Sequence, residues 1–334
     1  MTISAIICTR NRSEWLEWSL GALAVQHLPP TETILVDGSD EQHAGSNRQV
    51  LRDYEDKLGK VDYIKTKPGV TLQRNTGAAA ATGDIVVFID DDALIHPRYL
   101  HHVQERFAGD PEVIGVGGVI WNEMRRSTPA TAFRRIFTMT DNLRPRLTRS
   151  GDAGHLYECR GVVNVEALSG SNMAFRRSLF TEDGLKFDEN LKGYGFGEDQ
   201  LFCLQAGARG PLQQTDEALV MHAFRRTDRL SAKYARDQVT HAAYIFAAAG
   251  RSRGGRLGAL LWRLFGRTIY EVGNGLLHKR WDAARGAIGG LRHVVTNLGA
   301  FKTAPTRLLE DADVVEMRPP AASGSGHQQM DSAR

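Results

Sequence analysis

The chain has 334 residues, of which 42% are hydrophobic and 24% are charged, and its formal net charge is +3. This length and composition suit one large globular domain with an appendage, and they exclude disordered and fibrous chains. The three cysteines, Cys8, Cys159 and Cys203, have neither metal-type nor redox-type spacing, so we expect free thiols in a reducing compartment. The chain starts directly with a strand pattern and without the features of a signal peptide, which predicts a cytoplasmic protein.

The first two thirds of the chain alternate between strand and helix patterns, which is typical of βαβ units. The expected strands are residues 3–8, 33–36, 61–65, 85–89 and 113–119, and the expected helices are residues 13–26, 47–58, 72–81 and 97–107. Order is expected to loosen at 125–163 and to return at 167–175, in a helix at 198–208 and in a strand at 218–221. Beyond residue 231 the sequence predicts three helical pieces.

Three consecutive carboxylates, Asp90, Asp91 and Asp92, follow the apolar run 85–89. This run reads as a buried parallel strand, and open α/β sheets bind ligands at the carboxyl ends of such strands. Side chains alternate along a strand, so Asp90 and Asp92 should share a face. Three adjacent negative charges repel, and a divalent cation is the usual remedy. An acidic turn that caps the helix beginning near Pro97 is the alternative.

Further polar residues follow the other expected strands or open the helices behind them, and we expect them to converge on the same edge of the sheet. They are Thr9, Arg10, Asn11, Arg12, Asp37, Arg74, Asn75, Glu198, Asp199 and His222. Some of these residues also have a purely structural interpretation. Glu198 and Asp199 suit the first turn of any helix, where acidic side chains complement the dipole, and His222 suits an ordinary hydrogen-bonded histidine.

Six short motifs occur in a fixed order, at residues 7–12, 34–39, 73–77, 88–92, 170–176 and 197–199. Together they resemble family 2 glycosyltransferases of the GT-A fold, over about residues 1–225. The resemblance implies an α/β fold with a mostly parallel nucleotide-binding sheet flanked by helices. It also implies an inverting transfer of a sugar from a nucleoside diphosphate to an acceptor hydroxyl. Residues 226–315 would form a basic amphipathic helical extension, and residues 316–334 a disordered tail.

The resemblance also implies a role for each matching residue. Contacts with the nucleotide sugar would come from Thr9, Arg10, Asn11, Arg12, Asp37, Arg74, Asp90, Asp91, Gly170 and Asn172. Asp90, Asp92 and His222 would hold Mn²⁺ or Mg²⁺, and the imidazole would favour Mn²⁺. Asp199 would be the general base that takes the proton of the acceptor hydroxyl. The residues expected to contact the acceptor or to shape its loop are Glu198, Tyr194 and Phe196.

Residues 224–302 contain fifteen Lys and Arg but four Asp and Glu. No apolar run among them reaches the roughly 18 residues of a membrane span. One interpretation is that amphipathic helices within residues 226–300 lie on an anionic membrane, as a peripheral protein on the inner face of the cell membrane. The other is that ordinary basic helices pack on the main domain. Nucleic acid is not expected as a partner, because no binding motif accompanies the charge.

Two alternative functions share parts of this pattern. A Mg²⁺-dependent phosphohydrolase would carry its Asp-x-Asp pair after the first strand, whereas here it follows about the fourth. A catalytically inactive nucleotide-binding relative would have no use for Asp199 opposite the metal. UDP-sugar is favoured over dTDP- and GDP-sugar donors. A lipid-linked, polysaccharide or small glycoside acceptor would fit, in the synthesis of cell envelope polysaccharide, glycolipid or another glycoconjugate.

Overall fold

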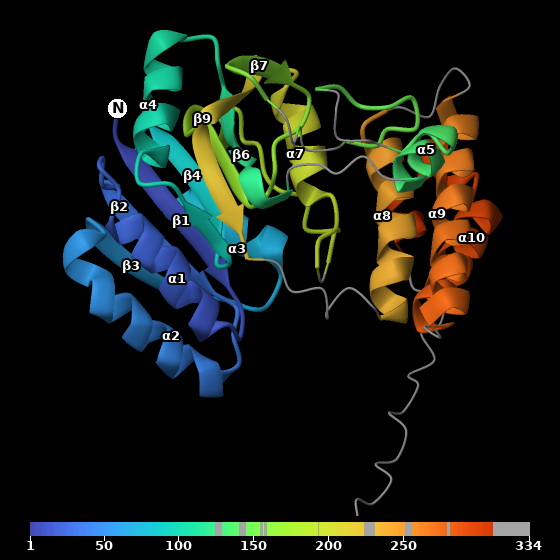
Figure 1. The fold of residues 1–334 in the computed structure, drawn as a ribbon, viewed down its shortest axis with the longest axis horizontal. Coiled ribbons are helices and arrows are strands. Elements are labelled where there is room, and N and C mark those ends of the chain that lie inside the picture. The colour runs from blue at the N-terminus through green and yellow to red at the C-terminus, as the bar shows by residue number, and fades with distance from the viewer. Residues whose placement is uncertain are drawn as a thin grey trace, which may run out of the picture.

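A computed structural model describes residues 1–123, 129–139, 145–153, 156, 159–192, 194–223, 231–250, 256–278 and 281–309 (Figure 1). The predicted tail at 316–334 lies outside these residues. The strands are β1 (Ile3–Thr9), β2 (Glu32–Asp37), β3 (Lys60–Lys65), β4 (Ile85–Asp90), β5 (Ala93–Ile95), β6 (Gly115–Ile120), β7 (Val162–Val165), β8 (Asn172–Arg176) and β9 (Leu212–His222). The helices are α1 (Ser13–Ala24), α2 (Glu41–Tyr54), α3 (Val70–Ala80), α4 (Tyr99–Gly109), α5 (Pro129–Ile136), α6 (Ser178–Thr181), α7 (Glu198–Ala206), α8 (Ala232–Ala248), α9 (Arg256–His278), α10 (Trp281–Thr296) and α11 (Ala300–Thr303).

One mixed sheet forms the centre of the first two thirds of the chain. Its strand order is β3-β2-β1-β4-β8-β6-β9-β5, and β7 pairs with β9. Strands β3, β2, β1 and β4 are parallel, β8 runs antiparallel to both β4 and β6, and β9 runs parallel to β6. The carboxyl ends of β1, β2, β4 and β9 therefore meet at one edge of the sheet. This arrangement confirms the predicted α/β class and its mostly parallel sheet.

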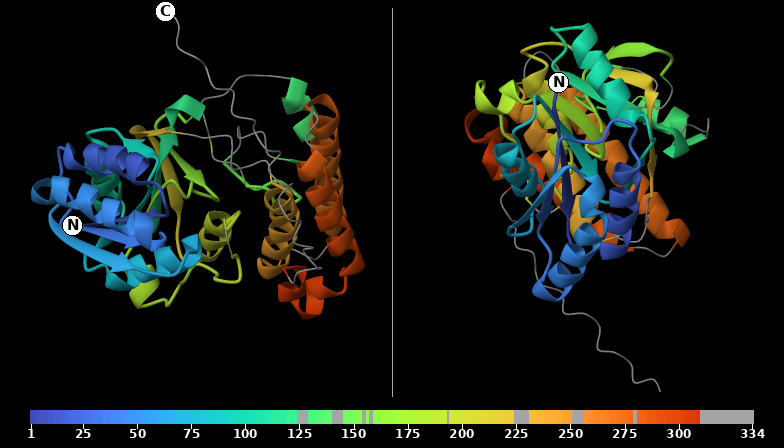
Figure 2. Two further views of the ribbon diagram at one scale, coloured as in Figure 1. Left: turned by 90° about the horizontal axis from the view of Figure 1, so that it is seen from below. Right: turned by 90° about the vertical axis from the view of Figure 1, so that its left-hand side faces the viewer.

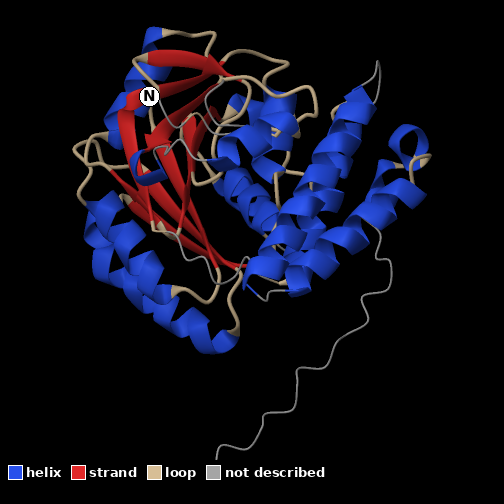
Figure 3. Cartoon of the chain, turned by 45° about the vertical axis from the view of Figure 1, so that its right-hand side comes forward, coloured by secondary structure: helices blue, strands red, loops and turns tan. Residues whose placement is uncertain are grey.

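Helices cover both faces of the sheet (Figures 2 and 3). On one face, Leu16 and Leu20 of α1 and Phe107 of α4 pack against inward residues of β1 and β4. On the other face, Ala78 of α3 and Phe202 of α7 pack against the alternate residues of the same strands. Residues 85–89 of β4 are almost completely buried because they face both layers, as expected for a β-branched run in a parallel sheet.

The helices α8, α9 and α10 form a separate hydrophobic core beside the sheet layer (Figure 1). Leu191 and Leu201, on the segment around α7, pack into this core and join it to the sheet layer. These helices confirm the predicted C-terminal helical extension. The division at residue 225 remains a proposal. No helix in the described ranges is both long enough and apolar enough to cross a membrane.

The structure differs from the sequence prediction most clearly at four elements. Helix α2 begins at Glu41, whereas the sequence predicted a start at residue 47. The prediction missed its first turns because they are polar and contain Gly45, so they show no apolar periodicity. Strand β9 begins at Leu212, whereas the sequence predicted a strand only from residue 218. The earlier residues were missed because they include the buried polar side chains Gln213 and Gln214, which do not form a strand pattern in the sequence. Strands β5 and β7 were not predicted, and both are short pairings against β9.

Candidate active site

A cleft of about 860 Å³ opens at the edge of the sheet where β1, β4 and β9 end. Most of the predicted site residues line it. They are Thr9, Arg10, Asn11, Arg12, Arg74, Asp90, Asp91, Asp92, Tyr194, Glu198 and His222. The parallel register explains this convergence, since Cys8 pairs with Asp90 and Thr9 pairs with Asp37 across neighbouring strands. The predicted residues Asp37, Gly170, Asn172, Phe196 and Asp199 are not among the described residues that line this cleft.

Asp90, Asp92 and His222 come together although β4 and β9 are far apart in the sequence. One donor atom from each lies within 4.8 Å of the others. His222 is the last residue of β9, and its Nε2 lies 3.0 Å from Oδ1 of Asp92. Two carboxylates and an imidazole at this spacing form a donor set that suits Mn²⁺ or Mg²⁺.

The electrostatics of the Asp cluster also fit a cation. Burial raises the pKa of Asp91 to about 7, an effect that Arg12 opposes and that Asp92 and Asp90 strengthen. Burial likewise raises the pKa of Asp90, against the opposing charge of Arg74. Thr9 stabilises the cluster by donating its hydroxyl to Asp91 at 2.7 Å. The raised pKa values mean that buried negative charge is incompletely compensated, and a divalent cation would compensate it.

Arg74 joins three parts of the site. Its side chain is 2% exposed on α3. One guanidinium nitrogen donates to Glu198, and the other donates to Asp90 at 3.0 Å and to the carbonyl oxygen of Gly170 at 2.9 Å. The pKa of Arg74 is raised because the charges of Glu198 and Asp90 outweigh the opposing effect of burial. Arg74 therefore holds β4, the turn at residue 170 and α7 in one arrangement.

The two acidic residues at the start of α7 differ in their surroundings. Glu198 is 8% exposed, its Oε2 has no hydrogen-bond partner in the described part of the chain, and burial raises its pKa well above the ordinary value. Asp199 is half-buried, and its Oδ2 accepts a hydrogen bond from the backbone nitrogen of Gly170 at 2.9 Å. Glu198 thus faces the cleft, while Asp199 is held against the turn beside it.

Asp37 is completely buried and its carboxylate is used within the protein. It accepts hydrogen bonds from the Ser39 backbone at 2.7 Å, from the Asn47 amide at 3.0 Å and from the Tyr63 hydroxyl at 2.7 Å. Burial alone would raise the pKa of Asp37, but these donors outweigh it and the pKa is lowered. The structure therefore gives Asp37 the task of fixing the end of β2, and its nucleotide contact remains a proposal.

Three other predicted residues also serve the framework. Asn172 is completely buried, and its side-chain oxygen accepts a hydrogen bond from the Gly118 backbone at 2.7 Å. Gly170 packs closely against Arg74, since a Cβ at this position would lie 3.0 Å from its guanidinium, a tight contact. The Phe196 carbonyl oxygen lies 3.3 Å from Nδ1 of His241 on α8. Their direct contacts with the donor or acceptor remain proposals.

Sequence reasoning missed several residues of the cleft wall, including Trp15, His43 and Gln73. Gln73 is the most informative of them. Its amide donates to the carbonyl oxygens of Thr9 and Val36, at 2.9 Å each, and so clamps the ends of β1 and β2 to α3. The signal was present in the sequence, since Gln73 opens the motif at 73–77 that was noted for Arg74.

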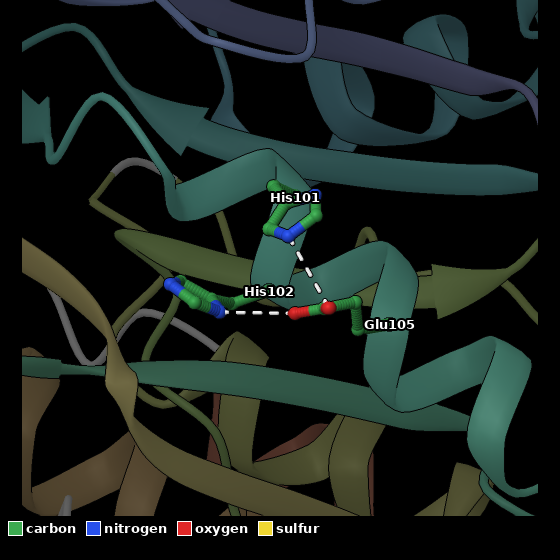
Figure 4. Close-up of side chains that lie close together, drawn as sticks. All are labelled: His101, His102 and Glu105. Carbon is green, nitrogen blue, oxygen red and sulfur yellow. Dashed lines mark hydrogen bonds and ion pairs between the residues drawn. The ribbon is translucent and has the colours of Figure 1, made fainter.

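A second group of metal-type donors lies on α4 (Figure 4). Glu105 contacts Nε2 of His101 and Nδ1 of His102, each at 3.2 Å. Glu105 is exposed and His101 is partly exposed, and none of the three residues lines the cleft. We treat this group as surface ion pairing.

The comparisons with known proteins agree with this geometry. The family described as "Glycosyl transferase family 2" matches residues 4–183. The chain is 34% identical over 265 residues to the validoxylamine A glucosyltransferase of Streptomyces hygroscopicus subsp. limoneus, covering 70% of this chain and 56% of the relative. It is 24% identical over 192 residues to the glucosyl-dolichyl phosphate glucuronosyltransferase of Haloferax volcanii, covering 55% of each chain. The chain thus spans little more than half the length of these relatives.

Two solved structures share the fold. Residues 1–349 of S. aureus TarS in complex with UDP-GlcNAc align with a TM-score of 0.54 and 18% identity, over 92% of this chain and 90% of that chain. The mannosyltransferase PcManGT from Pyrobaculum calidifontis, in complex with GDP-Man and Mn²⁺, aligns with a TM-score of 0.54 and 18% identity, over 92% and 84%. Because the family match covers more than half of the residues and includes β1, β2 and the Asp cluster after β4, the chain belongs to glycosyl transferase family 2.

Proposed function

We propose that this protein is a metal-dependent, inverting glycosyltransferase that moves a sugar from a nucleoside diphosphate sugar to an acceptor hydroxyl. The observation that carries the proposal is the convergence of Asp90, Asp92 and His222 at the mouth of an 860 Å³ cleft. Family membership argues against the phosphohydrolase alternative, as does the place of the Asp cluster after the fourth strand.

The residues of the cleft suit a diphosphate leaving group. Asp90, Asp92 and His222 would hold Mn²⁺ or Mg²⁺, which when bound supplies positive charge against the charge that develops on the diphosphate. Arg12 lies beside this group, with a guanidinium nitrogen 3.3 Å from Asp92, and would contribute a further positive charge there. The base and ribose would lie toward Thr9, Asn11 and Arg10, where β1 ends.

Asp199 is our proposal for the general base. As the C1–O bond to the diphosphate breaks, the acceptor oxygen would attack the anomeric carbon from the opposite face, and Asp199 would take its proton. Glu198 is the rival because it lines the cleft. However, Oε1 of Glu198 is already held in an ion pair with the buried guanidinium of Arg74, which makes it less available to take a proton. Tyr194 is 50% exposed beside the cleft and would contact a sugar ring.

The donor is left to experiment. TarS was solved with UDP-GlcNAc and PcManGT with GDP-Man, so the shared fold accommodates different bases. Calorimetric titration with UDP, dTDP and GDP, with and without Mn²⁺, should show tight binding of one nucleotide, and UDP is favoured. Binding should require both the metal and Asp92, so Asp92→Ala should abolish it. Asp62→Ala, a half-exposed carboxylate on β3, is the control and should leave binding intact. Metal-independent or absent binding of all three nucleotides would contradict the proposal.

The acceptor side of the proposal includes a membrane surface. On α10, Trp281, Arg285, Ile288, Arg292 and Val295 recur at alternating spacings of four and three and share one exposed face, which we name the α10 outer face. Large apolar side chains interleaved with arginines suit the boundary of an anionic bilayer. Arg263 and Arg267 of α9, by contrast, pair with Asp152 and Glu271, so they do not extend this basic face.

Vesicle flotation tests the membrane proposal. The intact chain should float with anionic phosphatidylglycerol vesicles and less with neutral phosphatidylcholine vesicles, because the face combines apolar and cationic side chains. Changing Trp281, Ile288 and Val295 together to serine should reduce flotation, whereas Trp18→Ser on α1, which is 54% exposed, should not. Equal flotation of all variants would contradict a role for the α10 outer face. A lipid-linked acceptor for a glycoconjugate or cell envelope polysaccharide would follow from a positive result.

A further inference from the structure

A second cavity, of about 390 Å³, lies beside the active-site cleft at the start of α8, and we name it the α8 pocket. Its walls come from the segment that leads to α7, from one face of α8 and from residues 306 and 309 near the end of the described chain. The volume lies within the range of small-molecule sites. None of the predicted nucleotide, metal or base residues lines it.

The described side chains that line the α8 pocket are mainly basic. Among the described residues, Lys192, Lys233 and Arg236 line it together with one carboxylate, Asp237. Lys233 and Asp237 form an ion pair at 2.8 Å, one turn apart on α8. The lining therefore carries a net positive charge, which comes from two separate segments of the chain. An arginine and lysines around a small hollow are suited to a phosphate, whose oxygens accept charge-assisted hydrogen bonds.

The pocket and the cleft share one loop. Nδ1 of His241, which also lines the α8 pocket, lies 3.3 Å from the Phe196 carbonyl oxygen and must donate to it, because a carbonyl only accepts. Burial lowers the pKa of His241, which favours the neutral imidazole. The ring of Tyr194, which lines the cleft, lies 5.3 Å from the ring of Tyr234 on α8. A group held in the pocket therefore lies next to the segment that precedes Glu198 and Asp199.

The backbone of this loop is fixed closely against its neighbours by two glycines. Gly195 and Gly197 have φ angles of 66° and 78°, in the left-handed region that favours glycine. A Cβ at Gly195 would lie 2.4 Å from Val70, and one at Gly197 would lie 2.6 Å from Ile245. The loop thus packs tightly between α3 and α8, and it ends where α7 presents its two acidic residues.

We infer that the α8 pocket binds a phosphate group carried by the acceptor, and that this contact places the acceptor hydroxyl beside α7. The inference deepens the proposed glycosyl transfer and rests on it for the identity of the acceptor. The donor's diphosphate would meet positive charge in the cleft, from the proposed metal and from Arg12, which does not line the α8 pocket, so we assign the pocket to the other substrate. The phosphate is that of a monoester, of a diester polymer or of a lipid-linked sugar.

The test is direct binding of simple phosphates to the full chain without metal, followed by calorimetry or by ligand-observed NMR. The probes are glycerol 1-phosphate, glycerophosphoglycerol and farnesyl phosphate, which represent a monoester, a diester and a lipid phosphate. We expect at least one probe to bind in the millimolar range or tighter. Arg236→Gln and Lys192→Gln should each weaken that binding about tenfold. Lys60→Gln, an exposed lysine on β3, is the matched control and should change nothing.

Two further measurements separate this inference from the proposed function. Asp92→Ala should bind the phosphate probe as the unaltered chain does, even if it binds no nucleotide, because Asp92 does not line the pocket. Arg236→Gln should keep its metal-dependent nucleotide binding, and nucleotide and probe should bind together. Displacement of the probe by nucleotide, or equal probe binding by Arg236→Gln, would overturn the inference. The best-bound probe then identifies the class of acceptor.

Discussion

The carboxylates at the ends of β2 and β4 lie at the same edge of the sheet but in opposite environments. Asp37 receives hydrogen bonds from three donors and its pKa is lowered, whereas burial raises the pKa of Asp90 and Asp91. Buried negative charge requires either fixed donors or a cation. The protein supplies fixed donors for the carboxylate of Asp37, whereas the negative charge of Asp90 and Asp91 is only partly compensated within the protein. Acids at the ends of two strands of one sheet therefore differ: Asp37 serves the framework, whereas we propose that the acids after β4 bind a ligand.

Glu198 and Asp199, at the start of α7, are a second pair of acids with different surroundings, and the largest expected effect on transfer activity concerns them. Asp199→Asn should reduce transfer by at least ~10²-fold while leaving metal and nucleotide affinity intact, because an amide cannot accept the proton. Single-turnover transfer and calorimetry on the same preparation measure both quantities. Glu198→Gln is the paired variant and should lose less, since Glu198 acts through Arg74. If Asp199→Asn turns over normally and Glu198→Gln does not, the base is Glu198.

A somewhat smaller effect is expected at the end of β4. Asp92→Asn should weaken Mn²⁺-dependent nucleotide binding by about 10²-fold, because one metal ligand is lost. It should not lower the free energy of unfolding of the metal-free protein, since it removes a repelling charge beside Asp90 and Asp91. Thermal unfolding with and without Mn²⁺ checks both statements. A metal-induced rise in Tm that survives in the variant would place the metal elsewhere.

The matching change at the end of β2 should have the opposite result. Asp37→Asn should lower the free energy of unfolding by about 2 kcal/mol, because a buried group with three donors loses its charge-assisted bonds. Denaturant unfolding measures this loss. Tyr63→Phe removes one of the three donors and should cost less. A strong loss of nucleotide affinity in a stable Asp37→Asn protein would show that Asp37 also contacts the ligand.

The smallest effect tests whether the lowered pKa of a framework acid depends on hydrogen bonds alone. Glu32 is 2% exposed and accepts hydrogen bonds from the Ser4 hydroxyl and from the backbone and hydroxyl of Thr82. Burial would raise the pKa of Glu32, but these donors lower it below its ordinary value of 4.5. Its stabilisation is therefore present above that value and is lost as pH falls through the folded pKa.

Glu32→Gln should accordingly reduce the free energy of unfolding by about 1 kcal/mol at pH 7. The difference from the unaltered chain should shrink as the pH falls well below 4.5, where Glu32 itself becomes protonated. Urea unfolding at a series of pH values measures both curves. A constant difference across that range would mean that the loss comes from packing and not from the charge of the carboxylate.

The sequence predicted the elements that have a clear apolar pattern and the site residues that directly follow them. Residues 85–90 could be placed because a buried parallel strand is a continuous run of β-branched and aromatic side chains. Strand β9 could not be placed in full, because Gln214 is buried and donates to the Leu156 carbonyl oxygen, a partner 58 residues away. A polar residue in a sheet interior is explained by such a partner, and the partner is visible only in three dimensions.

The same limit applies to the site. The position of His222 at the end of a strand was enough to place it near the Asp cluster, since parallel strands end at a common edge. The hydrogen bond between Asp199 and the Gly170 backbone depends on the turn between β7 and β8, which no local pattern describes. The α8 pocket depends on the packing of α8 against the segment at 190–197, and the basic residues there looked like any solvated helix face.

Arg74 has a consequence for how the protein acquires its activity. Its three partners lie 16, 96 and 124 residues away along the chain. None of these contacts can form by local folding, so the guanidinium reaches its final position after β4, the turn at 170 and α7 have all assembled. A partly folded chain therefore lacks the arrangement of β4, the turn at 170 and α7 that Arg74 holds together. Amide hydrogen exchange should be slow at all three segments. A change that speeds exchange at one of them should speed it at the other two, because they open as one cooperative unit.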